Sequence, residues 1–85
     1  MTMNMNKQAH PPHAFGRAVI FFRERKGWKQ YTLAKAAGRQ ASEVKRIEEA
    51  KTSPEVETIL WVAKALEVHP RELFAKMLEI MGYEE

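Results

Sequence analysis

Residues 30–49 read QYTLAKAAGRQASEVKRIEE, and they carry the pattern from which the fold class can be predicted. Its apolar side chains recur at spacings of three and four residues, which places them along one face of a helix. The positions with this spacing are Leu33, Ala34, Ala37, Val44 and Ile47. The pattern predicts one helix over residues 30–37 and a second helix over residues 41–49.

The two predicted helices are separated only by Gly38, Arg39 and Gln40. Glycine accepts the left-handed backbone conformation that ends helices. Two short helices joined by a glycine-containing turn of about three to four residues are typical of the helix-turn-helix motif. The small side chain of Ala34 lets the two helices approach closely. The stretch therefore predicts an all-α fold built around this motif.

A helix is also predicted before this pair, over residues 14–26. Phe15, Val19 and Phe22 lie four and three residues apart, so they share one face of that helix. Gly27 follows and is expected to end it.

Two more helices are predicted after the pair. Residues 52–55, TSPE, have the spacing of a capping box with a proline suited to a first turn, which predicts a helix start here and an end near Leu66. The positions expected to face the core are Val56, Ile59, Leu60, Ala63 and Leu66. His69 precedes Pro70 and is expected to cap a fifth helix that runs to Gly82.

The chain of 85 residues fits one domain, which we place at residues 13–82. Residues 1–12 lack hydrophobic periodicity and are expected to be a disordered tail, with a short second tail at 83–85. The absence of cysteine excludes disulfides and suits a reducing compartment. The longest apolar run, residues 18–22, is too short to span a bilayer, and the start lacks a secretion signal. We expect a cytoplasmic protein with no membrane partner.

The net charge of +3 is unevenly distributed. Residues 23–51 hold nine basic and four acidic side chains, whereas residues 52–85 hold three basic and seven acidic ones. This asymmetry favours a basic surface for a polyanion and an acidic surface elsewhere. Two ordinary solvated faces are the alternative.

Together these residues resemble the phage-repressor family of helix-turn-helix proteins, the Cro-type or xenobiotic-response-element group. The resemblance covers residues 16–74 and is specific because many short motifs occur in one order and spacing. It is carried by Arg23, Gly27, Trp28, Lys29, Gln30, Leu33, Ala34, Gly38, Ser42, Val44, Arg46, Ile47, Glu48, Lys51, Pro54, Glu57, Thr58, Ala63, Lys64, Ala65 and Leu66. It implies a compact five-helix, lambda-repressor-like domain that binds double-stranded DNA, usually as a homodimer.

The resemblance also implies that the helix over residues 41–49 places its N-terminal end in the major groove. The matching base-contacting positions are Gln40, Ala41, Ser42, Lys45 and Arg46. Arg46 suits a bidentate bond to guanine, with phosphate contact and plain solvation as alternatives. The positions expected to contact phosphate are Lys29, Gln30, Lys35, Arg39 and Lys51. Gln30 begins a helix, where free backbone amides favour an anion.

Arg23 and Glu48 match positions that form an internal ion pair in some members of the family. Such a pair would fasten the DNA-contacting helix to the first helix. We therefore expect a structural role for both residues.

The sequence departs from the family pattern at several positions. Lys29 and Gln40 stand where a Ser or Thr commonly caps a helix, so both caps are expected to be missing. Ala50 stands where glycine is usual, and a positive φ there would cost about 1 kcal/mol. Glu43 places a negative charge near the DNA, where it would either contact cytosine N4 or weaken binding.

Several apolar residues occupy positions where the family commonly has polar ones, namely Ile20, Phe21, Tyr31 and Trp61. The fifth predicted helix also carries an apolar stripe wider than one core contact needs. We expect a surface for self-association or another partner made of Trp61, Phe74, Met77, Leu78 and Met81. The alternative is a last helix that packs only on its own core.

An enzyme is not expected, because the sequence has no phosphate-cradling glycine loop and no cysteine nucleophile. No cofactor or metal is expected either, since the prolines between His10 and His13 oppose a helical ligand pair and no third ligand is evident. Two rival functions stay open: the antitoxin of a toxin–antitoxin pair, and a scaffold of the same fold that has lost DNA binding.

Overall fold

The computed structural model describes residues 10–83, which form five α-helices and no strand within that range. The helices are α1 (Pro11–Arg25), α2 (Gln30–Ala37), α3 (Ala41–Glu48), α4 (Val56–Leu66) and α5 (Pro70–Met81). The predicted all-α fold, with a short turn between α2 and α3, is confirmed.

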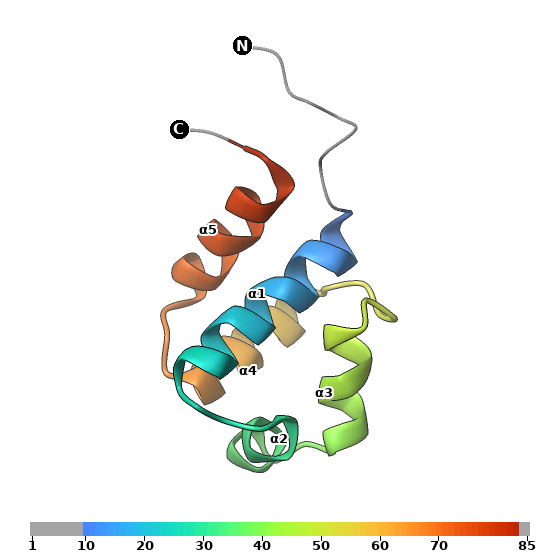
Figure 1. Cartoon of the computed structure of the whole chain (residues 1–85), viewed down its shortest axis with the longest axis vertical. Helices are drawn as coiled ribbons and strands as arrows, with labels where there is room; N and C mark the ends of the chain where they lie inside the picture. The colour runs from blue at the N-terminus through green and yellow to red at the C-terminus, as the bar shows by residue number, and fades with distance from the viewer. Residues whose placement is uncertain (1–9, 84–85) are drawn as a thin grey trace.

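Helix α1 runs through the middle of the molecule and contacts α3, α4 and α5 (Figure 1). Helix α2 packs against α3 and α4 at one end. All five helices contribute to one core, whose largest fully buried side chains are Phe15, Val19, Leu33, Val44, Val62, Leu66 and Leu73. None of the described helices is long and apolar enough to cross a bilayer.

The start of α1 differs from the prediction. Pro11 and Pro12 belong to the helix instead of to a disordered tail, because the fixed φ of proline suits the first turn and its missing N–H has no helical acceptor there. The prolines between His10 and His13 therefore begin a helix and do not oppose one. The rest of the predicted tail, residues 1–9, and the last two residues lie outside the described residues.

The start of α4 also differs from the prediction. The helix begins at Val56, and Glu55 at its N-cap makes no side-chain hydrogen bond, so the predicted capping box is wrong. Pro54 disfavours helical backbone for the residue before it, which keeps residues 52–55 irregular. Val56 and Leu60, predicted to face the core, are 73% and 50% exposed. Ala63 and Leu66 are buried as predicted, Ile59 is partly buried against the core, and Val62 is buried although it was not predicted to be.

Other local predictions hold. His69 caps α5: its Nδ1 accepts from the Arg71 N–H at 3.1 Å, and the Glu72 carboxylate accepts from the His69 N–H at 3.1 Å. Gly38 ends α2 with φ +67°, as expected for a left-handed C-cap. Neither Lys29 nor Gln40 makes a side-chain cap, so α2 and α3 start without one.

Gly16 sets how closely α1 approaches the C-terminal end of α3. A Cβ atom at this position would lie 2.7 Å from the carbonyl oxygen of Ile47 and 2.9 Å from that of Glu48. Both distances are well below ordinary van der Waals contact. The missing side chain of Gly16 therefore lets the backbones of α1 and α3 pack against each other.

Ala50 has φ +62° in the turn after α3. We expect Ala50→Gly to raise the free energy of unfolding by about 1 kcal/mol, because glycine adopts this conformation without strain on its Cβ atom. Urea unfolding followed by circular dichroism measures the change. Ala36→Gly is the control, since α2 is ordinary helix there and the same replacement should destabilise it by about 1 kcal/mol. A loss of stability in Ala50→Gly would contradict the prediction.

Candidate nucleic-acid interface

Helix α3 lies at one edge of the molecule with most of its surface free (Figure 1). Val44 and Ile47 of this helix are buried, and the side chain of Glu48 at its C-terminal end is only 3% exposed. The five residues predicted to contact bases are all exposed: Gln40, Ala41, Ser42, Lys45 and Arg46. The N-terminal end of α3 is therefore open to solvent, as docking into a major groove requires.

The residues predicted to contact phosphate have two different environments. Lys29, Lys35, Arg39 and Lys51 are exposed. Gln30 is half-buried, and its side-chain Nε2 donates to Glu48 Oε1 at 2.9 Å. That amide links α2 to α3 inside the protein, a role that the sequence pattern did not indicate.

Arg23 and Glu48 form a bidentate ion pair between α1 and α3. Arg23 Nε donates to Glu48 Oε2 at 2.7 Å, and Arg23 Nη2 donates to Oε1 at 2.9 Å. The side chain of Glu48 is only 3% exposed and that of Arg23 is 12% exposed. Arg23 Nη1 also donates to the Trp28 carbonyl at 2.8 Å.

This network holds the three elements that position the interface. The hydrogen bond to Glu48 raises the pKa of Arg23 above its ordinary value, against the opposing effect of burial. Glu48 accepts from Arg23 on α1 and from Gln30 on α2, so its carboxylate is satisfied although it is removed from water. The orientation of α3 relative to the core is fixed as a result.

Arg39, in the turn between α2 and α3, contacts two other side chains. Its Nη1 donates to Glu43 Oε2 at 3.2 Å. Its guanidinium carbon lies 4.6 Å from the centroid of the Trp61 ring on α4. Neither contact was foreseen from the sequence, because Trp61 is distant along the chain and Glu43 was considered only as a DNA contact.

A hollow of about 330 Å³ lies beside the exposed side of α3. Arg46 and Glu43 line it from α3, and Thr52, Ser53 and Thr58 line it from the following loop and α4. The sequence pattern assigned the threonine at 52 to a helix cap. Thr52 instead lines this hollow together with Arg46 and adds a hydroxyl group to the edge of the candidate interface.

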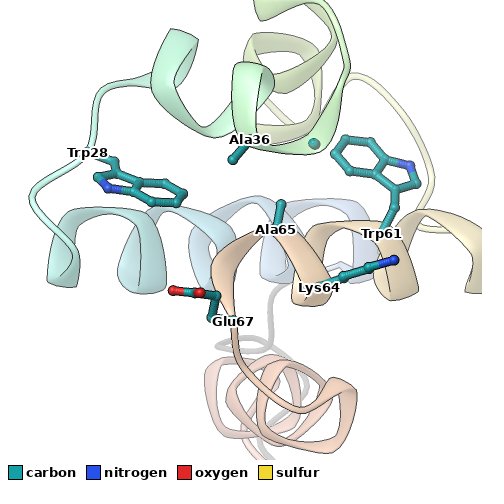
Figure 2. Close-up of a pocket in the computed structure, with 7 residues that line it drawn as sticks. Trp28, Ala36, Trp61, Lys64, Ala65 and Glu67 are labelled. Carbon is teal, nitrogen blue, oxygen red and sulfur yellow. The ribbon is translucent and has the colours of Figure 1, made fainter.

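A second hollow, of about 520 Å³, is lined by residues of α2 and α4 and of the turns that flank them (Figure 2). Trp28 and Trp61 stand at its two ends, and Ala36 and Ala65 lie between them. Lys26 Nζ lies 4.6 Å from the Trp28 ring centroid and pairs with Glu67 at 2.9 Å. That hydrogen bond from Lys26 lowers the pKa of Glu67 below its usual value.

The predicted partner surface is only partly exposed. Met77 is 3% exposed and belongs to the core, so its assignment to a surface is wrong. Leu73 and Met77 lie four residues apart and face the core together. Phe74 is 48% exposed, and Leu78 and Met81 are half-buried beside it.

Comparison with known proteins agrees with this geometry. A family model described as helix-turn-helix matches residues 21–73. The clp gene regulator ClgR from C. glutamicum superposes with a TM-score of 0.83 at 21% identity, covering 91% of this chain and 100% of ClgR. The restriction-modification controller protein C.AhdI from Aeromonas hydrophila gives a TM-score of 0.69 at 36% identity, covering 74% of this chain and 96% of C.AhdI. The restriction-modification controller protein C.Esp1396I gives a TM-score of 0.79 at 17% identity, covering 92% of this chain and 100% of C.Esp1396I. No curated protein matches the chain.

Proposed function

Because the chain belongs to the Cro/C1-type helix-turn-helix family, we propose that it is a sequence-specific DNA-binding transcription regulator that reads the major groove with α3. The observation that carries the proposal is the free N-terminal face of α3, held in place by the bond between Arg23 and Glu48. Under this proposal the protein acts in the cytoplasm, where it has access to the genome.

The exposed side chains of α3 have the chemistry for contacts with base edges. Arg46 suits the O6 and N7 atoms of guanine, Ser42 suits several bases, and the methyl group of Ala41 suits the methyl group of thymine. Lys29, Lys35, Arg39 and Lys51 supply positive charge around them for phosphates. The side-chain amide of Gln30 has two N–H groups, and one of them donates to Glu48. We propose that the second N–H contacts a phosphate.

A homodimer is the second part of the proposal. Phe74 is 48% exposed on α5, and Leu78 and Met81 are half-buried on the same helix, so these side chains offer an apolar surface that a second copy would cover. Two copies would place their α3 helices in successive major grooves, about 34 Å apart. Analytical ultracentrifugation of the protein, alone and with DNA, tests this. A chain that stays monomeric and binds a single half-site as a monomer would contradict the proposal.

The DNA-binding proposal predicts a strong salt dependence. Duplex affinity should fall steeply as salt rises, and Lys35→Ala or Lys51→Ala should each reduce the slope of log K against log[salt] by about one, because each removes a phosphate contact. The measurement is fluorescence anisotropy with a duplex chosen from a random pool by the protein itself. Lys64→Ala, in the last turn of α4, is the control and should leave the slope unchanged.

The same selection reports which half-site the protein prefers. Arg46→Ala should weaken binding by about 1–3 kcal/mol and relax the preference at one base pair. A wild-type chain without affinity for any duplex at low ionic strength would refute the proposal and favour a scaffold that has lost DNA binding.

The identity of 36% to C.AhdI favours a finer candidate, control of a restriction–modification system. Footprinting upstream of the protein's own gene, with a reporter assay for repression or activation, tests it. The antitoxin alternative predicts instead a toxin that copurifies tightly with the chain.

A further inference from the structure

Trp61 is the residue with the largest side chain next to the candidate interface, yet it belongs to a different element. It projects from α4 toward the end of α2 (Figure 2). Arg39 leaves the turn immediately before Gln40, the N-cap of α3. The guanidinium carbon of Arg39 lies 4.6 Å from the centroid of the Trp61 ring, which is the geometry of a cation–π contact.

This contact leaves N–H donors of Arg39 available. A cation–π contact engages the charge of the guanidinium, whereas hydrogen bonds use its five N–H groups. Glu43 accepts from Nη1 alone. Two contacts therefore orient the guanidinium while further N–H donors stay open, and the side chain of Arg39 is 38% exposed.

Arg39 differs in this respect from the lysines proposed to contact phosphate. Within residues 10–83, Lys29, Lys35 and Lys51 make no ion pair and no cation–π contact. A free lysine loses side-chain entropy when it binds, whereas an arginine held by two contacts is already ordered.

We propose that Trp61 is a positioning residue for DNA binding, which holds the Arg39 guanidinium at the leading end of α3 in the orientation that contacts a phosphate. The inference rests on the proposed DNA-binding function and extends it to a residue of α4. The ring of Trp61 is then contacted by Arg39 of the same chain, whereas its apolar character had suggested contact with a partner protein.

The test is a double-mutant cycle on duplex affinity, measured by anisotropy with the selected duplex. Trp61→Leu should weaken binding by about two- to fivefold without changing the salt slope, because Arg39 still reaches the phosphate but is no longer held. Arg39→Ala should weaken binding and reduce the salt slope by about one. The double variant should bind no more weakly than Arg39→Ala alone, since Trp61 acts through Arg39.

Two controls separate positioning from general packing. Trp28→Leu removes the tryptophan at the other end of the same hollow, next to Lys26, and should leave affinity unchanged. Trp61→Phe keeps an aromatic face and should retain most of the affinity. Circular dichroism reports whether each variant folds. If Trp61→Leu does not fold, the affinity of Trp61→Phe, with and without Arg39, is measured in its place.

The outcomes distinguish the inference from the function on which it rests. Suppose that the wild type binds DNA and Trp61→Leu lowers the affinity equally in the wild-type and Arg39→Ala backgrounds. This result would overturn the positioning role of Trp61 but leave the DNA-binding function in place. Equal effects of Trp61→Leu and Trp28→Leu, or no effect of Trp61→Leu, would do the same. A wild-type chain that binds no duplex would overturn both.

Discussion

Glu48→Ala is expected to lower the free energy of unfolding by about 3 kcal/mol, the lower end of the range for breaking a buried ion pair. The variant leaves Arg23 with an unpaired charge that is only 12% exposed and removes the acceptor of Gln30 Nε2. The lower end applies because water still reaches Arg23. For a domain of this size the loss corresponds to a fall in melting temperature of roughly 12–24 °C, measured by circular dichroism.

Glu49→Ala is the matched control for this prediction. Glu49 is the next residue along the chain and carries the same charge, but it is exposed and lies 4.0 Å from Lys45. Its replacement should change the free energy of unfolding by no more than about 0.5 kcal/mol. If Glu48→Ala and Glu49→Ala melt at the same temperature, the carboxylate of Glu48 does not hold α3 to α1.

Gly16→Ala is expected to destabilise the protein by about 1–3 kcal/mol, the usual cost of overpacking a core. Alanine normally stabilises a helix by about 1 kcal/mol relative to glycine, so the prediction has the opposite sign from helix propensity. The reason is the distance of 2.7 Å between the added Cβ and the carbonyl oxygen of Ile47. That atom is backbone and cannot rotate away, so α1 and α3 must separate. Urea unfolding measures the loss.

Arg17→Ala provides the comparison, because Arg17 is the exposed neighbour of Gly16 on α1. It should change stability by no more than about 0.5 kcal/mol. A Gly16→Ala variant more stable than the wild type would mean that the contact between α1 and α3 relaxes without cost. The DNA affinity of the variant then reports whether α3 has moved.

Most of the local structure could be predicted from the sequence, because it depends on neighbouring residues. The apolar spacing of Leu33 and Ala34, the left-handed glycine at 38 and the strained φ of Ala50 are local properties. The cap formed by His69 is local as well. The starts of α1 and α4 were predicted wrongly although the prolines that decide them are local. The exposure of Val56 and Leu60 was predicted wrongly because it depends on which face of α4 meets the other helices.

The candidate interface could be predicted in part. The pairing of Arg23 with Glu48 and the free face of α3 were expected from the resemblance, and both are present. The burial of Met77 was not expected. The apolar residues of α5 cover two adjacent rows of the helix, and their spacing does not show which row faces the core.

Short helices with a tight turn before α3 follow from the sequence alone, because backbone preference and apolar spacing act over a few residues. The packing of the helices brings the distant groups together: Gly16 against the end of α3, Gln30 on Glu48, and Arg39 on Trp61. These contacts depend on the distances and angles between packed helices, to which residues far apart in the chain contribute together.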